Sequence, residues 1–304
     1  MNKPIRIGTR DSELALWQAK NVQKALEKLG HKSKLVPVKS KGDLVLDKPL
    51  YEFGITGIFT KTLDIAMLTG EIDIAVHSMK DVPTSLPKGI VQAAVLKREN
   101  PIDVLIHKGL DFLQKKGSIA TGSLRRKAQW LHKYPKHEVV NLRGNLNTRL
   151  QKLNDNDWNG AIFATAGLER INLKPKNYID LDWMIPAPAQ GAMLVVAKEK
   201  DEHFRKILAA LNHEASDICT HIERQFLKTL EGGCTAPIGA LAKIENETIY
   251  FKGGLFSLDG EQKFVEQISF PIDEFEKAGE KAANSILERG GRELMREIKE
   301  GLKT

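Results

Sequence analysis

The sequence predicts an α/β protein in which two α/β domains are followed by a small C-terminal α+β domain. Three observations predict this class. Helix and strand patterns alternate through the first hundred residues, the alternation restarts at about Pro101, and turn-rich β patterns replace it after about Glu214. At 304 residues, with 41% hydrophobic and 28% charged residues, the chain can bury a core in each of two or three domains.

The first α/β domain is predicted from strands that run into amphipathic helices. Its patterns are, in order, PIRIGTR (4–10), SELALWQAKNVQKALEKLG (12–30), TKTLDIAMLTG (60–70) and IDIAVHS (72–78). Asp11 or Ser12 is the expected N-cap of the first helix, and Gly30 and Gly70 close the two helices. Such alternation is typical of a parallel α/β layer.

The rest of the sequence predicts the second α/β domain and the C-terminal α+β domain. Three further strand-to-helix junctions, in SIATGSLRRKAQWL (118–131), EVVNLRGNLNTRLQKL (138–153) and GAIFATAGLERI (160–171), predict the second α/β domain. The β-rich segment 240–270 contains Glu-Asn and Asp-Gly turns, which predict antiparallel hairpins. Residues 274–301 are expected to form a long helical tail.

The targeting and cysteine patterns predict a cytoplasmic protein. The amino terminus lacks the apolar segment of a signal peptide, and no run approaches the eighteen or so apolar residues of a membrane span. The two cysteines, Cys219 and Cys234, are expected to be free thiols. Cys219 lies near an apolar helical stripe and is expected to be buried. Cys234 follows that helix in the loop EGGCTAPIG and is the cysteine expected to reach a cleft.

The positive charges gather where strands meet helices. The net charge is +7 and the pI about 9.2. Arginines at these junctions converge on one sheet edge, where helix N-termini favour anions. The arginines in question are Arg10, Arg125, Arg126, Arg143, Arg149 and Arg170. They predict a site for a ligand with several acidic groups, although each alone could form a surface ion pair.

One carboxylate stands at the same predicted edge. Asp81 follows a strand in HSMKDVP, beside Lys80, and is a candidate catalytic acid, although an aspartate before such a loop could simply cap a turn. His77 in the same strand is expected to be structural. No metal site is expected, and a group of two histidines and an aspartate on one helical face (His213, Asp217 and His221) is interpreted as solvated or hydrogen-bonded.

These segments resemble the motifs of the hydroxymethylbilane synthase family, also called porphobilinogen deaminases. The matching motifs are HSMKDVP, GSLRR, LRGNLNTRL, AGLERI, PAQGA and EGGCTAPIG, and they appear in the family's order over nearly the whole chain. The resemblance implies two domains similar to the type II periplasmic binding-protein fold and a small third domain. It implies boundaries at 1–97 with 191–211, at 98–190 and at 212–304, with a lid at 40–58. It also implies that four porphobilinogen molecules condense into hydroxymethylbilane with release of four ammonia molecules.

The resemblance also implies the site residues. Cys234 would carry a covalent dipyrromethane, and Asp81 would be the catalytic carboxylate that faces the pyrrole nitrogens. The residues that would bind the cofactor, porphobilinogen and the growing oligopyrrole are Arg10, Ser12, Phe59, Lys80, Thr121, Ser123, Arg125, Arg126, Arg143, Arg149, Arg170 and Gln190.

The chain departs from the family at four positions. Glu52 and Thr56 stand where relatives often have lysines, which puts lid contacts to carboxylates in doubt. Gly122 replaces a frequent serine, and Glu169 replaces a frequent lysine. Phe59 is retained and could pack on a pyrrole or fill the core.

Two readings from other classes stay open. A non-catalytic anion-binding module of the periplasmic type would share the α/β domains, but it would have no use for Cys234 or Asp81. A nucleic-acid-binding protein would share the positive charge, yet the Lys and Arg residues are not massed in one helix and aromatic residues make up only 6%. No nucleic-acid or membrane partner is expected, and the protein is expected to be a monomer.

Overall fold

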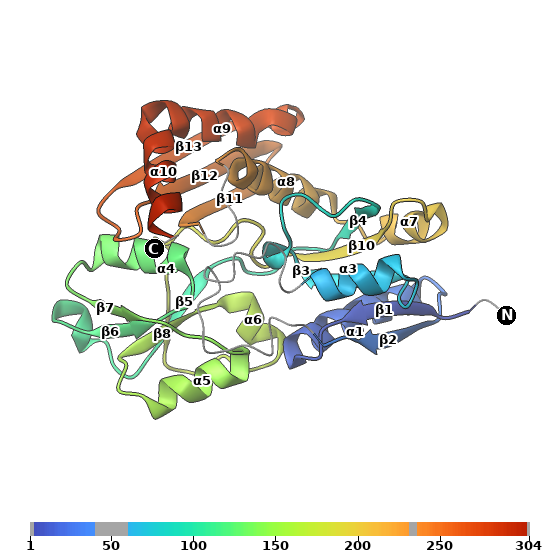
Figure 1. Ribbon diagram of the computed structural model, residues 1–304, viewed down its shortest axis with the longest axis horizontal. Helices are drawn as coiled ribbons and strands as arrows, with labels where there is room; N and C mark the ends of the chain where they lie inside the picture. The colour runs from blue at the N-terminus through green and yellow to red at the C-terminus, as the bar shows by residue number, and fades with distance from the viewer. Residues whose placement is uncertain (1–2, 40–59, 231–235, 303–304) are drawn as a thin grey trace. The chain divides into compact units, whose positions relative to one another are not determined.

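The computed structural model describes residues 3–39, 60–230 and 236–302, which fall into two compact units (Figure 1). The described part of the first unit comprises 3–39, 60–99 and 191–217, and that of the second comprises 100–190, 218–230 and 236–302. No helix in these stretches is long and apolar enough to cross a membrane.

The first unit contains a five-stranded sheet with helices packed on it. Its elements are β1 (Ile5–Thr9), α1 (Glu13–Lys28), β2 (Ser33–Pro37), α3 (Lys61–Leu68), β3 (Ile74–Ser78), the 3₁₀ turn η2 (Met79–Asp81), β4 (Ile90–Val95), β10 (Met193–Lys198) and α7 (Glu202–Ala209). The strand order is β2-β1-β3-β10-β4. β1 is parallel to β2 and β3, whereas β10 is antiparallel to β3 and β4.

The sequence accounts for these elements. Most residues of β3 and β10 are buried, as expected for strands covered on both faces of a sheet. Ser12 occupies the N-cap of α1, one of the two predicted positions, although its side chain makes no capping hydrogen bond. Gly30, with a φ of +83°, follows the last turn of α1, where a left-handed residue ends the helix.

The second unit contains a sheet with the same plan. Its elements are β5 (Asp103–His107), the 3₁₀ turn η3 (Asp111–Gln114), β6 (Ser118–Ala120), α4 (Leu124–Lys133), β7 (Glu138–Val140), α5 (Leu146–Asp155), β8 (Gly160–Ala164), α6 (Thr165–Arg170) and β9 (Tyr178–Asp180). The order is β7-β6-β8-β5-β9, with β6 parallel to β7 and β8 and with β5 antiparallel to β8 and β9. Two α/β sheets of the type II periplasmic binding-protein kind are therefore present, as predicted.

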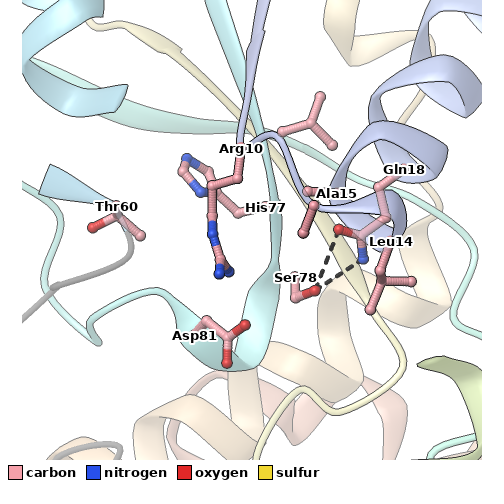
Figure 2. Close-up of a pocket in the computed structure, with 10 residues that line it drawn as sticks. Arg10, Leu14, Ala15, Gln18, Thr60, His77, Ser78 and Asp81 are labelled. Atoms are coloured by element: carbon pink, nitrogen blue, oxygen red, sulfur yellow. Dashed lines mark hydrogen bonds between the residues drawn. The ribbon is translucent and has the colours of Figure 1, made fainter. Parts of the chain in front are cut away.

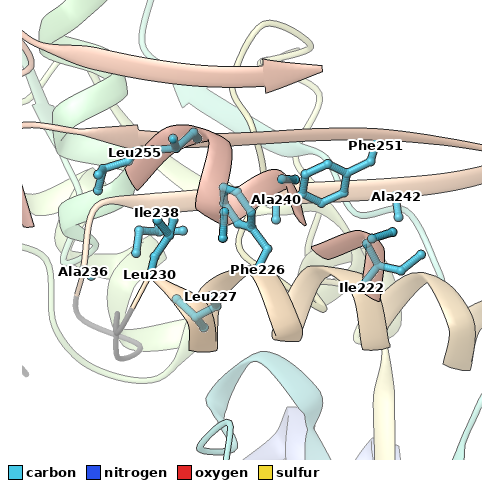
Figure 3. Close-up of a cluster of buried hydrophobic side chains, with 14 of the residues drawn as sticks. Ile222, Phe226, Leu227, Leu230, Ala236, Ile238, Ala240, Ala242, Phe251 and Leu255 are labelled. Carbon is cyan, nitrogen blue, oxygen red and sulfur yellow. The ribbon is translucent and has the colours of Figure 1, made fainter. Parts of the chain in front are cut away.

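The C-terminal part of the second unit is α+β. Its elements are α8 (Glu214–Thr229), which begins in the first unit, β11 (Ile238–Glu245), β12 (Thr248–Phe256), β13 (Lys263–Pro271), the 3₁₀ turn η4 (Ile272–Lys277), α9 (Ala278–Ile286), the π turn η5 (Leu287–Gly291) and α10 (Arg292–Gly301). The three strands form an antiparallel sheet. Figure 3 shows Phe226 of α8 beside the strands, and this core also includes Ile286 of α9 and Leu294 of α10.

The predicted long helical tail is broken. Gly290 has a φ of +111°, which an L side chain rarely adopts, and the break separates α9 from α10. At the start of α9, a Cβ on Gly279 would lie 2.1 Å from the carbonyl oxygen of Ile222, so the glycine allows α9 to approach α8 closely.

Two contacts join the three-stranded sheet to α4 and to the segment that follows β9. The amide of Ala240 donates to the carbonyl of Pro186 at 2.9 Å, and Phe256 packs with Ala128 and Ile185. The domain boundaries implied by the resemblance, at 97/98, 190/191 and 211/212, stay predictions.

Candidate active site

A polar pocket lies in the first unit, where β1 and β3 end. Arg10 directly follows β1, and Asp81 closes the turn η2 that follows β3. Figure 2 shows the Arg10 guanidinium and the Asp81 carboxylate pointing into this pocket from the two strand ends. Its lining residues are Arg10, Ser12, Leu14, Ala15, Gln18, Thr60, Val76, His77, Ser78 and Asp81. The structure therefore brings three predicted site residues together at the predicted edge of the sheet.

The exposure of the pocket suits a ligand with charged groups. Arg10, Ser12, Lys80 and Asp81 are half-buried, so each is reachable while its position is restrained by the fold. A carboxylate and a guanidinium that share one pocket can hold opposite charges of one ligand. Lys80 occupies the same turn as Asp81.

A buried amide fixes the wall of the pocket. The side chain of Gln18 is 2% exposed, and its Nε2 donates to Ser78 Oγ at 2.9 Å. This hydrogen bond ties α1 to the end of β3 (Figure 2). Gln18 is not among the residues predicted from sequence, although a glutamine among the buried residues Ala19, Val22 and Leu26 of α1 is a detectable signal.

His77 is a neutral residue of this pocket. Burial, assisted by the nearby Arg10 charge, lowers the pKa of His77 to about 4. The imidazole therefore carries no positive charge near pH 7 and cannot serve there as the acid of the site. This agrees with its interpretation as a structural residue.

In the second unit, two predicted arginines share one buried carboxylate. Arg125 and Arg126 lie in the first turn of α4 and are 4% and 6% exposed. Asp103, fully buried at the start of β5, lies 2.8 Å from Arg125 Nη1 through Oδ2 and 2.7 Å from Arg126 Nη2 through Oδ1. Gln190 Nε2 also donates to Asp103 Oδ1, at 2.9 Å.

The balance of charge in this cluster favours an additional anion. Burial by itself would raise the pKa of Asp103, but the charges of Arg125 and Arg126 hold this pKa well below its ordinary value. Two guanidiniums then face one carboxylate, which leaves an excess positive charge in a buried place. Cations in the first turn of a helix are also disfavoured by its dipole, so an anion there would be stabilising.

Arg125 and Arg126 differ in how many of their guanidinium donors the described residues occupy. Arg125 Nη1 donates to the carbonyl of Ile185 at 2.7 Å, whereas its buried Nε has no hydrogen-bond partner among the described residues. An unsatisfied buried donor is costly, and a carboxylate would satisfy it. Arg126, by contrast, uses Nε and Nη2 on Asp103 and Nη1 on the carbonyl of Ile162, so it also serves the fold.

The other predicted residues of the second unit occupy helix starts and buried positions. Ser123 is the N-cap of α4, where its Oγ accepts from the amide of Arg126, and its own amide donates to Thr121 Oγ1 at 3.3 Å. Arg149 Nε donates to the carbonyl of Gly144 at 2.7 Å. Arg143 and Arg170 are 5% and 6% exposed.

Several predicted residues fall outside the part of the chain that the structure describes. Cys234 and Phe59, and the lid at 40–58 with Glu52 and Thr56, lie outside the described residues. At Gly122, a Cβ would lie 2.5 Å from the carbonyl oxygen of Leu142, so a serine would require this backbone to shift.

The histidine and aspartate side chains of the α8 region take separate partners. His213 Nδ1 lies 2.9 Å from Ser216 Oγ, Gln92 Nε2 donates to Asp217 Oδ1 at 2.7 Å, and His221 Nε2 lies 3.3 Å from the carbonyl of Glu276. Within the described part of the chain, no group of three or more His, Cys, Asp or Glu residues could hold a metal ion.

Sequence reasoning missed two buried carboxylates, Asp103 and Glu223. Each is 0% exposed. A charged residue inside an apolar pattern, as in IDVLI or IERQF, indicates that a residue distant in the sequence neutralises it or hydrogen-bonds to it. The pattern does not identify that partner residue. Glu169, in contrast, forms a half-exposed ion pair with Lys174.

Comparisons with known proteins identify the family. The family model described as "Porphobilinogen deaminase, dipyromethane cofactor binding domain" matches residues 5–206, and "Porphobilinogen deaminase, C-terminal domain" matches 218–288. The chain is 40% identical over 310 residues to porphobilinogen deaminase of Chloroherpeton thalassium, covering 98% of this chain and 99% of the relative. It is 42% identical over 302 residues to that of Moorella thermoacetica, covering 97% and 96%.

Among solved structures, a periplasmic substrate-binding protein of an ABC transporter from Coxiella burnetii matches with a TM-score of 0.43 and 16% identity, over 70% of this chain and 93% of that one. The family models and the relatives cover nearly the whole chain. The chain therefore belongs to the porphobilinogen deaminase (hydroxymethylbilane synthase) family of transferases, and it contains that family's dipyrromethane cofactor binding domain.

Proposed function

We propose that this enzyme assembles hydroxymethylbilane from four porphobilinogen molecules on a dipyrromethane primer that is joined by a thioether to Cys234. A cysteine thiolate is a good nucleophile, and a thioether, unlike an ester, is not lost by hydrolysis during turnover. When bound, the dipyrromethane supplies the pyrrole carbon to which the first substrate is joined. Each condensation forms one carbon–carbon bond and releases one ammonia molecule, and water then cleaves the finished tetrapyrrole from the primer and supplies its hydroxyl group.

The buried arginine pair is the observation that supports this proposal most strongly. Pyrroles made from porphobilinogen carry acetate and propionate groups. A cluster with excess positive charge and an unsatisfied Nε donor on Arg125 matches such a carboxylate. We therefore assign Arg125 to a carboxylate of the cofactor, with Arg126 and Gln190 holding the cluster through Asp103.

The pocket of the first unit is assigned to the chemical step. As ammonia leaves porphobilinogen, positive charge develops on the substrate's pyrrole system. The half-buried carboxylate of Asp81 can stabilise this charge and move protons, while Arg10 and Lys80 bind substrate carboxylates. His77 is excluded as a proton donor near neutral pH because its pKa is lowered to about 4.

The other predicted site residues are assigned to ligand binding by their positions in the fold. Ser12, Thr121 and Ser123 offer hydroxyls near the helix starts, and Arg143, Arg149 and Arg170 supply further positive charge to the growing oligopyrrole. Phe59 is assigned to the site by resemblance alone. A monomeric state and a cytoplasmic location stay predictions, and light scattering of the purified protein tests the first.

The intact mass of the purified protein tests the attachment. We expect a mass larger than that of the sequence by two pyrrole units, and we expect the excess in the proteolytic peptide that contains Cys234. Cys219, which is buried in the core of the α+β part, is the internal control and should be unmodified. Full activity with an unmodified Cys234 would exclude the proposed attachment.

A further inference from the structure

A backbone turn beside the arginine pair has an unfavourable conformation. In the turn 187–190, the amide of Gln190 donates to the carbonyl of Ala187 at 2.9 Å, and Pro188 and Ala189 occupy the two central positions. Ala189 has a φ of +61°, the left-handed conformation that the third position of a type II turn requires. Glycine adopts this conformation freely, whereas alanine does so at a cost of about 1–2 kcal/mol.

Glu223 supports this turn from α8. Its side chain is fully buried, and Oε2 accepts a hydrogen bond from the amide of Ala189 at 2.7 Å. Oε1 accepts from the amide of Ala242 in β11, also at 2.7 Å. Because its two carboxylate oxygens accept from two backbone amides, Glu223 fixes the position of the Ala189 amide and can offset the cost of the left-handed residue.

The residue after Ala189 leads directly to the arginine pair. Gln190 is fully buried, and its Nε2 donates to Asp103 Oδ1 at 2.9 Å and to the carbonyl of Pro101 at 2.6 Å. The same Oδ1 accepts from Arg126 Nη2 at 2.7 Å. A change in the backbone at 189 would therefore move Gln190 away from the carboxylate that orients both arginines.

We propose that Glu223 is a positioning residue for cofactor binding, which acts through the left-handed conformation of Ala189 and through Gln190 on the Asp103 carboxylate and its two arginines. This inference rests on the proposed role of Arg125 toward the cofactor. The same helix α8 ends at Thr229, a few residues before Cys234 in the sequence. Glu223 thus links the helix that leads to the attachment cysteine with the cluster that would bind the cofactor's carboxylates.

A purely structural role of Glu223 makes a different prediction. If Glu223 matters only because it satisfies the amide of Ala242, a change at Ala189 should not compensate for its loss. If it matters because it stabilises the turn, Ala189→Gly should compensate, since glycine adopts a φ of +61° without support. The two roles are therefore separable by a double-mutant cycle.

The experiment compares full-length parent, Glu223→Gln, Ala189→Gly and the double variant. The ratio of loaded to unloaded chains is measured by intact mass, and KM and kcat for porphobilinogen are measured on the loaded fraction. A loss of support in this turn should slow cofactor loading of Glu223→Gln by about 5- to 30-fold, which corresponds to about 1–2 kcal/mol in barrier, and so lower its loading ratio. We expect Ala189→Gly to raise loading much more in the Glu223→Gln background than in the parent.

The outcomes separate the two proposals. Two outcomes contradict the positioning role but leave the proposed function intact. In the first, the parent is loaded, Glu223→Gln is poorly loaded, and Ala189→Gly does not restore its loading. In the second, Glu223→Gln is loaded like the parent. A parent without the added mass contradicts the proposed function, and the positioning role fails with it. If Glu223→Gln gives no folded protein, Glu223→Asp with and without Ala189→Gly answers the same question, because aspartate keeps the charge but is shorter by one methylene.

Discussion

The two α/β sheets share one spatial arrangement of parallel and antiparallel strands but differ in how deeply their charged residues are buried. In the first unit, the strand ends hold a half-buried acid, Asp81, beside a neutral His77. In the second, the start of α4 holds two buried arginines on one carboxylate. The comparison teaches that one architecture can hold a half-buried, accessible acid in one copy and a buried cluster of hydrogen-bonded charges in the other.

The largest effect is expected at Asp81. Asp81→Asn preserves the shape of the side chain and removes its charge, and we expect it to lower kcat for hydroxymethylbilane formation by about 10³- to 10⁴-fold, or about 4–5.5 kcal/mol in barrier. Initial rates of product formation by cofactor-loaded protein provide the measurement. Asp182→Asn, at an exposed position, is the matched control. A loss of less than about tenfold would mean that another group performs this role.

Asp103 should matter for stability as well as for binding. Asp103→Asn leaves two buried guanidiniums facing an amide, and we expect the free energy of unfolding to fall by about 3–5 kcal/mol. Urea denaturation followed by circular dichroism measures this change. An unchanged denaturation midpoint would show that Asp103 does not stabilise the two buried arginines. It would therefore contradict the description of this cluster as buried charges held together by hydrogen bonds.

The neutral His77 predicts a pH dependence of stability. Its pKa is about 4 in the folded protein and near 6.5 when unperturbed, so between these values the unfolded chain binds a proton that the folded chain does not. The stability contributed by neutral His77 is complete above about pH 6.5 and falls by about 3 kcal/mol as the pH decreases to 4. Urea denaturation across this range should show a steeper decrease for the parent than for His77→Gln. The exposed His203→Gln is the control and should behave like the parent.

The smallest effect is expected at an ion pair of the first unit. Asp73 pairs with Arg6 through Oδ1 at 2.6 Å, but the Arg6 side chain is 34% exposed. Asp73→Asn should therefore cost only about 1 kcal/mol of unfolding free energy, which the same urea measurements can resolve. A cost equal to that of Asp103→Asn would contradict the view that burial sets the difference between these two aspartates.

Local patterns predicted more of the fold than of the site. The alternation of strands and helices predicted both sheets and the convergence of Arg10 and Asp81, because strand ends meet at one edge whatever the detailed packing. The contacts of Asp103 and Glu223 could not be predicted, since their partners lie far away in the sequence. The break in the C-terminal helix depends on a single glycine conformation, at Gly290, that composition alone does not determine.

The sequence does not distinguish the roles of the two neighbouring arginines, Arg125 and Arg126. Their position at the start of a helix predicted an anion site, but a sequence does not show which guanidinium donors are already occupied. In the structure, Arg126 donates from all three guanidinium nitrogens to Asp103 and Ile162, whereas Arg125 retains an unsatisfied Nε among the described residues. The sequence predicted one role for both neighbours, whereas the roles that we propose from their contacts differ.

The most direct test of this division of roles is the intact mass of Asp81→Asn and Arg125→Gln, purified in parallel with Arg296→Gln, which removes an exposed arginine, as a control. We predict that Asp81→Asn and Arg296→Gln carry the mass of two added pyrrole units at the level of the parent, whereas Arg125→Gln is largely without it. Equal loading of Asp81→Asn and Arg125→Gln, whether both are full or both empty, would contradict the assignment of catalysis to one α/β sheet and cofactor binding to the other.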